Sequence, residues 1–214
     1  MKQIFYFLLL VAIGSFSCTK DDVVQTDTQV GSSKITYYAT VTIKGDQYMS
    51  VVKDGTFTDP GATAVVDGEE IQVTTSGSVN TAVPGLYTIT YTGTNSDGYS
   101  SSGSRTVAVL PAAENASSNI AGSYVYVANT AYSNTITKVA SGLYNCSNTW
   151  GASTIPALLV CVDGTNIFIY SQSSPFGTLS TTTGSSITST GRLTLEITIP
   201  SQDISGSKRV WQKQ

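Results

Sequence analysis

Residues 55–64 read Gly-Thr-Phe-Thr-Asp-Pro-Gly-Ala-Thr-Ala and lie in a region where apolar and polar residues alternate. The same alternation continues in Tyr87-Thr88-Ile89-Thr90-Tyr91 and Thr106-Val107-Ala108-Val109, so each segment has one apolar and one polar face. Four dipeptides that favour tight turns separate such segments: Asp54-Gly55, Asp67-Gly68, Pro84-Gly85 and Asp97-Gly98. Short strands divided by turns, with no run of helical periodicity, predict an all-β chain that begins with a β-sandwich.

Three motifs in this region, in the same order, resemble those of a bacterial surface immunoglobulin-like domain. They are residues 55–64, the segment Val83-Pro84-Gly85-Leu86-Tyr87-Thr88-Ile89-Thr90-Tyr91, and the closing Ser104-Arg105-Thr106-Val107-Ala108-Val109. The resemblance covers residues 34–110 and implies an immunoglobulin-like β-sandwich. It also implies that Pro84-Gly85 forms a corner, that Tyr87 and Tyr91 point inward and that Arg105 begins the last strand. Domains of this family act as spacers and adhesion modules, so no catalytic residue is carried over.

A short stretch of small and polar residues, 111–119, predicts a linker to a second domain at residues 120–214. Asp163-Gly164 between two apolar runs predicts a hairpin there. About eight candidate strands follow one another, which predicts an antiparallel meander that forms a β-barrel-like sheet or a sandwich. They are 122–128, 134–140, 142–147, 157–162, 166–171, 177–180, 192–199 and 208–212.

The ends of this second domain, Ala121-Gly122-Ser123-Tyr124 and Arg209-Val210-Trp211, resemble those of lipocalin-like barrels. An immunoglobulin-like domain followed by Ile136-Thr137-Lys138-Val139 and Gly142-Leu143-Tyr144 also resembles a two-domain lipoprotein family of unknown function in Bacteroidetes.

The first residues combine one Lys, an apolar run from Ile4 to Ile13, small residues and a single Cys. This pattern predicts a secretory signal at residues 1–17, because the apolar run is too short to span a bilayer. Cys18 resembles the lipid acceptor of a bacterial lipoprotein, and the acidic residues Asp21 and Asp22 resemble a surface-export signal. We therefore expect residues 18–33 to be a flexible tether from the outer membrane, with the protein facing outward. The alternative is an ordinary secreted protein that loses Cys18 with its leader.

Composition excludes several classes of function. The chain has 11 basic and 14 acidic side chains, a net charge of −3, which argues against a nucleic-acid partner. It contains no His, which removes the commonest general base, the commonest metal ligand and every Ser–His or Cys–His nucleophile. We expect no catalytic residue, no cofactor and no metal.

Apart from Cys18, two cysteines remain, Cys146 and Cys161, and both lie in strand-like segments. An extracytoplasmic compartment would permit a disulfide between them. The alternative is two buried free thiols that pack as small hydrophobic residues.

Aromatic residues near amides make a carbohydrate the leading ligand. A sugar ring has an apolar face that stacks on an aromatic ring, and its hydroxyls need amide partners. The segment Tyr144-Asn145-Cys146-Ser147-Asn148-Thr149-Trp150 offers both, and the candidate binding residues are Trp150, Tyr144, Asn148 and Tyr132. The alternative is that Trp150 closes the barrel mouth and Tyr144 belongs to the core.

The function predicted is non-catalytic capture of glycan, with outer-membrane uptake proteins as partners. Two rival functions are adhesion to another protein and carriage of a small apolar ligand inside a lipocalin-like barrel.

Overall fold

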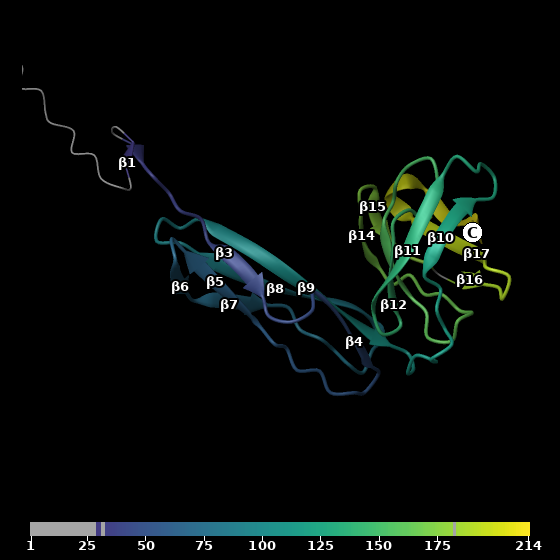
Figure 1. Cartoon of the computed structure of the whole chain (residues 1–214), viewed down its shortest axis with the longest axis horizontal. Coiled ribbons are helices and arrows are strands. Elements are labelled where there is room, and N and C mark those ends of the chain that lie inside the picture. The colour runs from purple at the N-terminus through teal and green to yellow at the C-terminus, as the bar shows by residue number, and fades with distance from the viewer. Residues whose placement is uncertain (1–28, 31–32, 182) are drawn as a thin grey trace, which may run out of the picture. The chain divides into compact units, whose positions relative to one another are not determined.

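The computed structural model describes residues 29–30, 33–181 and 183–214 (Figure 1). The described residues up to Tyr37 belong to one unit, and those from Tyr38 to Gln214 form a second. The predicted signal peptide, Cys18 and most of the predicted tether lie outside the described residues. In the first unit, β1 (Gln29–Val30) pairs antiparallel with β2 (Ser33–Lys34). Within the described ranges, no helix is long and apolar enough to cross a membrane.

The first half of the second unit has two facing sheets, as the alternating pattern predicted. One sheet has the order β3–β5–β6, with bounds Thr40–Ile43, Ala62–Val66 and Glu69–Ile71. The other has the order β4–β9–β8–β7, with bounds Tyr48–Val52, Ser100–Leu110, Gly85–Thr94 and Val73–Ser76. Strands β4 and β9 pair in parallel, and the other pairs are antiparallel. The all-β fold with an immunoglobulin-like sandwich is therefore confirmed.

The sandwich core contains a charged residue, Arg105, whose side chain is fully buried. Its guanidinium pairs with Asp59, and its Nη1 donates to the Tyr91 hydroxyl at 2.9 Å. Its Nε donates to the Asp46 carbonyl at 2.9 Å, and its Nη2 donates to the Lys44 carbonyl. Residues of the first, second and third motifs thus meet at one guanidinium, which explains why these residue types occur together.

Asp59 is held as a carboxylate by this network. Burial alone would raise its pKa, but hydrogen bonds from Tyr91 and Gly61 and the charge of Arg105 keep the pKa below its ordinary value. Burial, together with the hydrogen bond to Asp59, raises the pKa of Tyr91 to about 12. Tyr91 points inward, as the family resemblance implied, whereas Tyr87 is half-buried and donates to the Val83 carbonyl at 2.8 Å.

The second half forms one antiparallel sheet of seven strands, in the order β13–β12–β11–β10–β18–β17–β16. The strand bounds are β10 Gly122–Tyr126, β11 Ser133–Ala140, β12 Leu143–Cys146, β13 Ala157–Val160, β16 Ser186–Ile187, β17 Arg192–Ile199 and β18 Ile204–Lys213. A separate hairpin consists of β14 (Gln172–Ser174) and β15 (Gly177–Leu179), and a 3-10 turn, Pro200–Gln202, precedes β18. The first and last strands of this half pair with each other, Tyr126 opposite Trp211.

The two edge strands of this sheet are joined by the segment 165–169. Phe168 exchanges two backbone hydrogen bonds of 2.9 Å with Val160 of β13. On its other side, Ile167 donates to Ser185 at 3.0 Å, and Ile187 of β16 donates to Thr165 at 2.8 Å. The sheet therefore curls until its edges meet through this segment, which makes it barrel-like. The Asp163-Gly164 turn that precedes the segment is the hairpin expected from the sequence.

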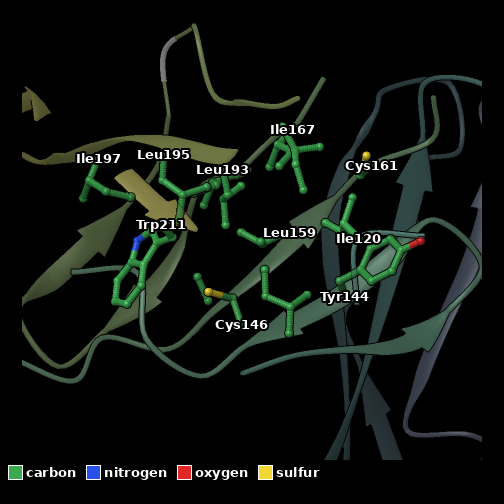
Figure 2. Close-up of a cluster of buried hydrophobic side chains, with 14 of the residues drawn as sticks. Ile120, Tyr144, Cys146, Leu159, Cys161, Ile167, Leu193, Leu195, Ile197 and Trp211 are labelled. Atoms are coloured by element: carbon green, nitrogen blue, oxygen red, sulfur yellow. The ribbon is translucent and has the colours of Figure 1, made fainter. Parts of the chain in front are cut away.

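Apolar side chains fill the interior of the barrel-like sheet (Figure 2). Trp211, Tyr124 and Leu159 are each fully buried there, together with isoleucines and leucines of β17. A second buried cluster contains Ala108, Leu110, Leu143, Val160 and Val162.

The two cysteines are free thiols, both buried, so the disulfide alternative is wrong for this structure. Cys146 pairs with Ala157 across β12 and β13, whereas Cys161 lies four residues further along the same hairpin. Four residues of strand separate their Cα atoms by about 13 Å, and a disulfide needs less than about 7 Å. Figure 2 shows the two sulfur atoms well apart, with Cys146 below the middle of the cluster and Cys161 at its upper right. Burial raises the pKa of Cys146 to about 12, so it remains a thiol.

The segment 111–119 is attached to the barrel-like half by side-chain contacts. Glu114 accepts hydrogen bonds from Lys138 at 2.7 Å, Ser141 at 3.0 Å and Tyr144 at 2.8 Å. Asn115 donates from its backbone to Val162 at 2.7 Å. A domain boundary at these residues stays a prediction.

We expect Asp59→Asn to lower the free energy of unfolding by roughly 3–5 kcal/mol at neutral pH, since it leaves the buried Arg105 charge without its carboxylate. The pKa of Asp59 is lowered on folding, so its contribution is present above the pKa of the unfolded chain and disappears as pH falls through the folded value. The difference in unfolding free energy between the wild-type protein and Asp59→Asn, measured by urea unfolding, should therefore disappear as pH falls below about 4.

Glu196→Gln is the matched control, because it removes an ion pair of 3.2 Å with Lys208, whose side chain is 68% exposed. Its cost should stay within about 1 kcal/mol. Equal losses in the two variants would contradict a structural role for the buried pair.

Candidate functional site

Trp150 lies in the loop between β12 and β13, and Asn148 holds that loop in shape. The Asn148 Oδ1 accepts hydrogen bonds from the backbone of Trp150 at 3.0 Å and Gly151 at 3.1 Å, and its Nδ2 donates to the Gly151 carbonyl at 2.9 Å. Asn148 is only 7% exposed, and its side-chain amide makes its hydrogen bonds within the loop. It positions Trp150 and is not free to bind a ligand, which corrects the expectation from the sequence.

Tyr144 does not belong to a binding surface. It is fully buried on the inner face of β12, and its hydroxyl lies 2.8 Å from Glu114 and 2.6 Å from the Ser118 carbonyl. Burial, with the hydrogen bond and charge of Glu114, raises the pKa of Tyr144. The alternative weighed from the sequence, a core Tyr144, is therefore the one observed. Tyr132 is half-buried in the loop between β10 and β11, where its backbone hydrogen-bonds to Tyr126 at 2.9 Å.

The structure brings Trp150 to a different set of partners. The guanidinium carbon of Arg209 lies 3.4 Å from the centre of the half-buried Trp150 ring. Arg209 Nη1 donates to the Tyr126 hydroxyl at 3.1 Å, and the Tyr126 ring lies 5.1 Å from that of Trp211. We call Trp150, Arg209, Tyr126 and Trp211 the aromatic–arginine stack. Trp150 packs against the buried cluster of the barrel-like half, and its closing of the barrel mouth stays a prediction.

A small hollow adjoins this stack. It has a volume of about 160 Å³ and is lined by Trp150, Ser153, Ile155, Phe176, Ile199, Gln202 and Ile204. This space equals about five water molecules in the liquid, enough for one small group but not for a drug-sized ligand.

A larger depression lies beside the segment that joins the sheet edges. This trough has a volume of about 570 Å³, and its lining comprises residues 166–170, Thr181 and residues 183–186. Phe168 and Tyr170 are stacked within it, with ring centres 6.1 Å apart and planes at 10°. Phe168 is 39% exposed, whereas its neighbours Ile167 and Ile169 are buried. The trough therefore combines a flat aromatic surface with amide and hydroxyl groups.

The sequence contained the signal for Phe168 and Tyr170, although the candidate residues did not include them. Ile167-Phe168-Ile169-Tyr170 alternates two isoleucines with two aromatics. Once the face with the two isoleucines is known to be buried, both rings must lie on the opposite face. What the sequence alone did not show was which face the barrel-like sheet encloses.

Acidic side chains do not form a metal site among the described residues, where no three His, Cys, Asp or Glu side chains gather. Asp163, beside the trough, is occupied by its own turn. It accepts from the backbone of Thr165 at 2.8 Å and of Asn166 at 2.7 Å. Burial would raise its pKa, but these hydrogen bonds, with that from the Asn166 amide, keep the pKa below its ordinary value.

Comparison with known proteins identifies the first half of the second unit. Residues 41–109 match the family described as bacterial surface protein, Ig-like domain. These residues form a bacterial surface Ig-like domain. No curated protein matches the sequence.

Two of the solved structures that are similar to this chain extend beyond the surface Ig-like domain. A lipoprotein from Bacteroides thetaiotaomicron shares 22% identity with a TM-score of 0.40, covering 83% of this chain and 100% of that chain. The M60 catalytic domain with the CBM51-1 and CBM51-2 domains of ZmpB from Clostridium perfringens shares 18% identity with a TM-score of 0.30, covering 65% of this chain and 15% of that one. Similarity at this level assigns neither a ligand nor a partner to this chain.

The two tryptophans should respond differently to truncation. Trp211→Ala removes a fully buried ring and should cost roughly 3–5 kcal/mol of unfolding free energy. Trp150→Ala removes a half-buried ring and its contact with Arg209, and should cost only about 1–2 kcal/mol. Calorimetric melts of both variants measure the difference. A loss for Trp150→Ala as large as that for Trp211→Ala would place Trp150 in the core.

Proposed function

We propose that this protein is a non-catalytic cell-surface lipoprotein that binds carbohydrate on its barrel-like half. The observation that carries the proposal is the trough in which Phe168 and Tyr170 stack beside Asn166, Thr183 and Ser186. Its volume of 570 Å³ falls within the range of small-molecule sites.

The physical argument rests on stacking. Sugar hydroxyls exchange hydrogen bonds with water for hydrogen bonds with protein, and each such exchange contributes only about 0.5–1.5 kcal/mol. An aromatic surface contributes more, because the apolar face of a sugar ring leaves water when it stacks on it. The exposed face of Phe168 supplies that surface, and Asn166 and Thr183 supply polar partners at its rim.

Two rival functions are weighed against specific observations. Carriage of an apolar ligand inside a lipocalin-like barrel requires an internal chamber, but the barrel interior is filled by Trp211, Tyr124 and their neighbours. Adhesion to another protein is favoured by the surface Ig-like domain at residues 41–109, which belongs to a family of bacterial surface proteins. Binding of glycan and an adhesive or spacing role for the Ig-like domain are compatible.

The anchor is part of the same proposal. The pattern of residues 1–18 supports attachment to the outer membrane through lipid on Cys18, with the protein directed outward by Asp21 and Asp22. A tethered glycan-binding protein at this place would have outer-membrane uptake proteins as partners. Nucleic acid is not expected as a partner, given the net charge of −3.

Phe168→Ala should abolish binding of a neutral glycan, since truncation of a central aromatic in a binding site commonly costs more than about 2 kcal/mol. The measurement is a glycan array with the soluble protein, followed by calorimetric titration of the neutral glycan that binds. Tyr99→Ala is the control, because Tyr99 is an aromatic 51% exposed in the Ig-like domain. Unchanged affinity in Phe168→Ala, or equal loss in both variants, would refute the trough as the site.

Cys18→Ala should release the protein from the membrane fraction of the cells that express it. The measurement is fractionation after a high-salt wash, with Cys161→Ala as a control that leaves the N-terminal region unchanged. A Cys18→Ala protein that stays with the membrane would contradict attachment through lipid on this residue.

A further inference from the structure

We infer that the end of the barrel-like half around Arg209 is a second binding site, which takes the carboxylate of an acidic sugar. This goes beyond the proposed function, because it concerns different residues and a different ligand chemistry from the trough. It does not depend on the trough being a site.

The first observation is a set of buried donors without acceptors. Three buried side-chain atoms of the described residues make no hydrogen bond: Asn134 Nδ2, Arg209 Nε and Trp211 Nε1. All three are N–H donors, and Asn134 and Trp211 are 1% and 0% exposed. Unsatisfied buried polar groups are rare in proteins and each needs an explanation.

The second observation is that these donors belong to one connected group. Asn134 Oδ1 accepts from the backbone of Asn148 at 3.2 Å, and Asn148 in turn accepts from the backbone of Trp150. The Trp150 ring contacts the Arg209 guanidinium at 3.4 Å. Arg209 donates to the Tyr126 hydroxyl, and the Tyr126 ring contacts that of Trp211. The orphaned donors therefore lie along the aromatic–arginine stack and the loop that covers it. These side chains offer donors and lack acceptors, so acceptor oxygens of a ligand would complement them.

The third observation is charge. Arg209 has no carboxylate partner among the described residues, whose three ion pairs involve Arg105, Lys138 and Lys208. The β17–β18 hairpin has two acidic residues: Glu196 pairs with Lys208, and Asp203, in the turn before β18, makes no ion pair with a described residue. Arg209 and Lys208 are consecutive residues of β18, so their side chains leave opposite faces of the strand. A guanidinium without an anion at the end of an apolar core favours an anionic ligand.

Stacking leaves one donor of Arg209 available to a ligand. Trp150 lies against the guanidinium, whose carbon is 3.4 Å from the centre of the ring. Nη1 is bound to Tyr126 and Nε is buried, whereas Nη2 makes no hydrogen bond to a described residue. A carboxylate oxygen accepts a strong hydrogen bond from such a charged donor.

The adjoining hollow favours a sugar as the bearer of this carboxylate. Its volume of about 160 Å³ admits one small group, and Trp150 and Ile204 provide an apolar wall. Ser153 and Gln202 provide polar partners on the same lining. Trp150 belongs both to the lining of the hollow and to the stack with Arg209, so an acidic sugar in the hollow would lie beside the residue that contacts the guanidinium.

The experiment compares a galacturonic acid trimer with a galactose trimer, which has the same ring without the charge. Binding is followed by tryptophan fluorescence, because the chain has only 2 tryptophans and both belong to the stack. We expect the acidic trimer to bind at least tenfold more tightly at low salt and to change the fluorescence of Trp211→Phe, in which Trp150 alone reports.

Arg209→Gln should weaken binding of the acidic trimer at least tenfold, and Arg209→Lys should recover only part of it, since a lysine lacks the planar guanidinium that stacks on Trp150. Lys208→Gln is the matched control: it removes the same charge from the adjacent residue on the opposite face and should leave affinity unchanged. Phe168→Ala should also leave it unchanged, which separates this site from the trough. Circular dichroism checks that each variant is folded.

Four results would overturn the inference. They are equal affinity for the acidic and neutral trimers, equal weakening by Lys208→Gln and Arg209→Gln, no binding of the acidic trimer at millimolar concentration, and equally tight binding of triglycine, whose carboxylate is not on a sugar.

Discussion

The barrel-like half depends on the pairing of its first strand, β10, with its last, β18. This pairing sets Tyr126 opposite Trp211 and lets the large indole fill the centre of the curled sheet. Without it, β10 and β18 would be open edges, which are costly in a β protein because their backbone groups stay unpaired. Closure of the sheet also determines which side chains lie on its outer face. The segment that bridges the remaining edges must turn one face inward, so Phe168 is left exposed and Tyr170 half-buried on the other face.

In the surface Ig-like domain, a buried charge has the comparable role. Burying Arg105 would be prohibitive without partners, and Asp59, Tyr91 and two backbone carbonyls supply them from separate strands and loops. An apolar core would tolerate shifts between its strands, but a guanidinium with directional partners tolerates few. The motif around Gly61 is explained in the same way, because its backbone amide also binds Asp59, and its φ of 76° suits glycine.

How much of this followed from the sequence depends on the range of the interaction. Alternation predicted most strands of both halves, including Arg192–Ile199 with the observed bounds, because the pattern is local. Contacts between distant segments were not predictable. Tyr144 proved to be core because Glu114, thirty residues earlier, accepts its hydroxyl, and a disulfide proved impossible because of strand register. Trp150 was identified as a candidate, but its partner Arg209 comes from the far end of the chain.

The chain contains no His, so any ligand that it binds must be recognised without an imidazole. Without imidazole, specificity must come from shape, from flat aromatic surfaces and from the few charges that the fold leaves unpaired. The two depressions differ in this respect. The trough contains the rings of Phe168 and Tyr170 without a cation, whereas the Trp150 ring beside the hollow is covered by the Arg209 guanidinium. Because a guanidinium on an aromatic face blocks stacking there but can still donate to an anion, the two proposed sites would favour neutral and acidic rings respectively.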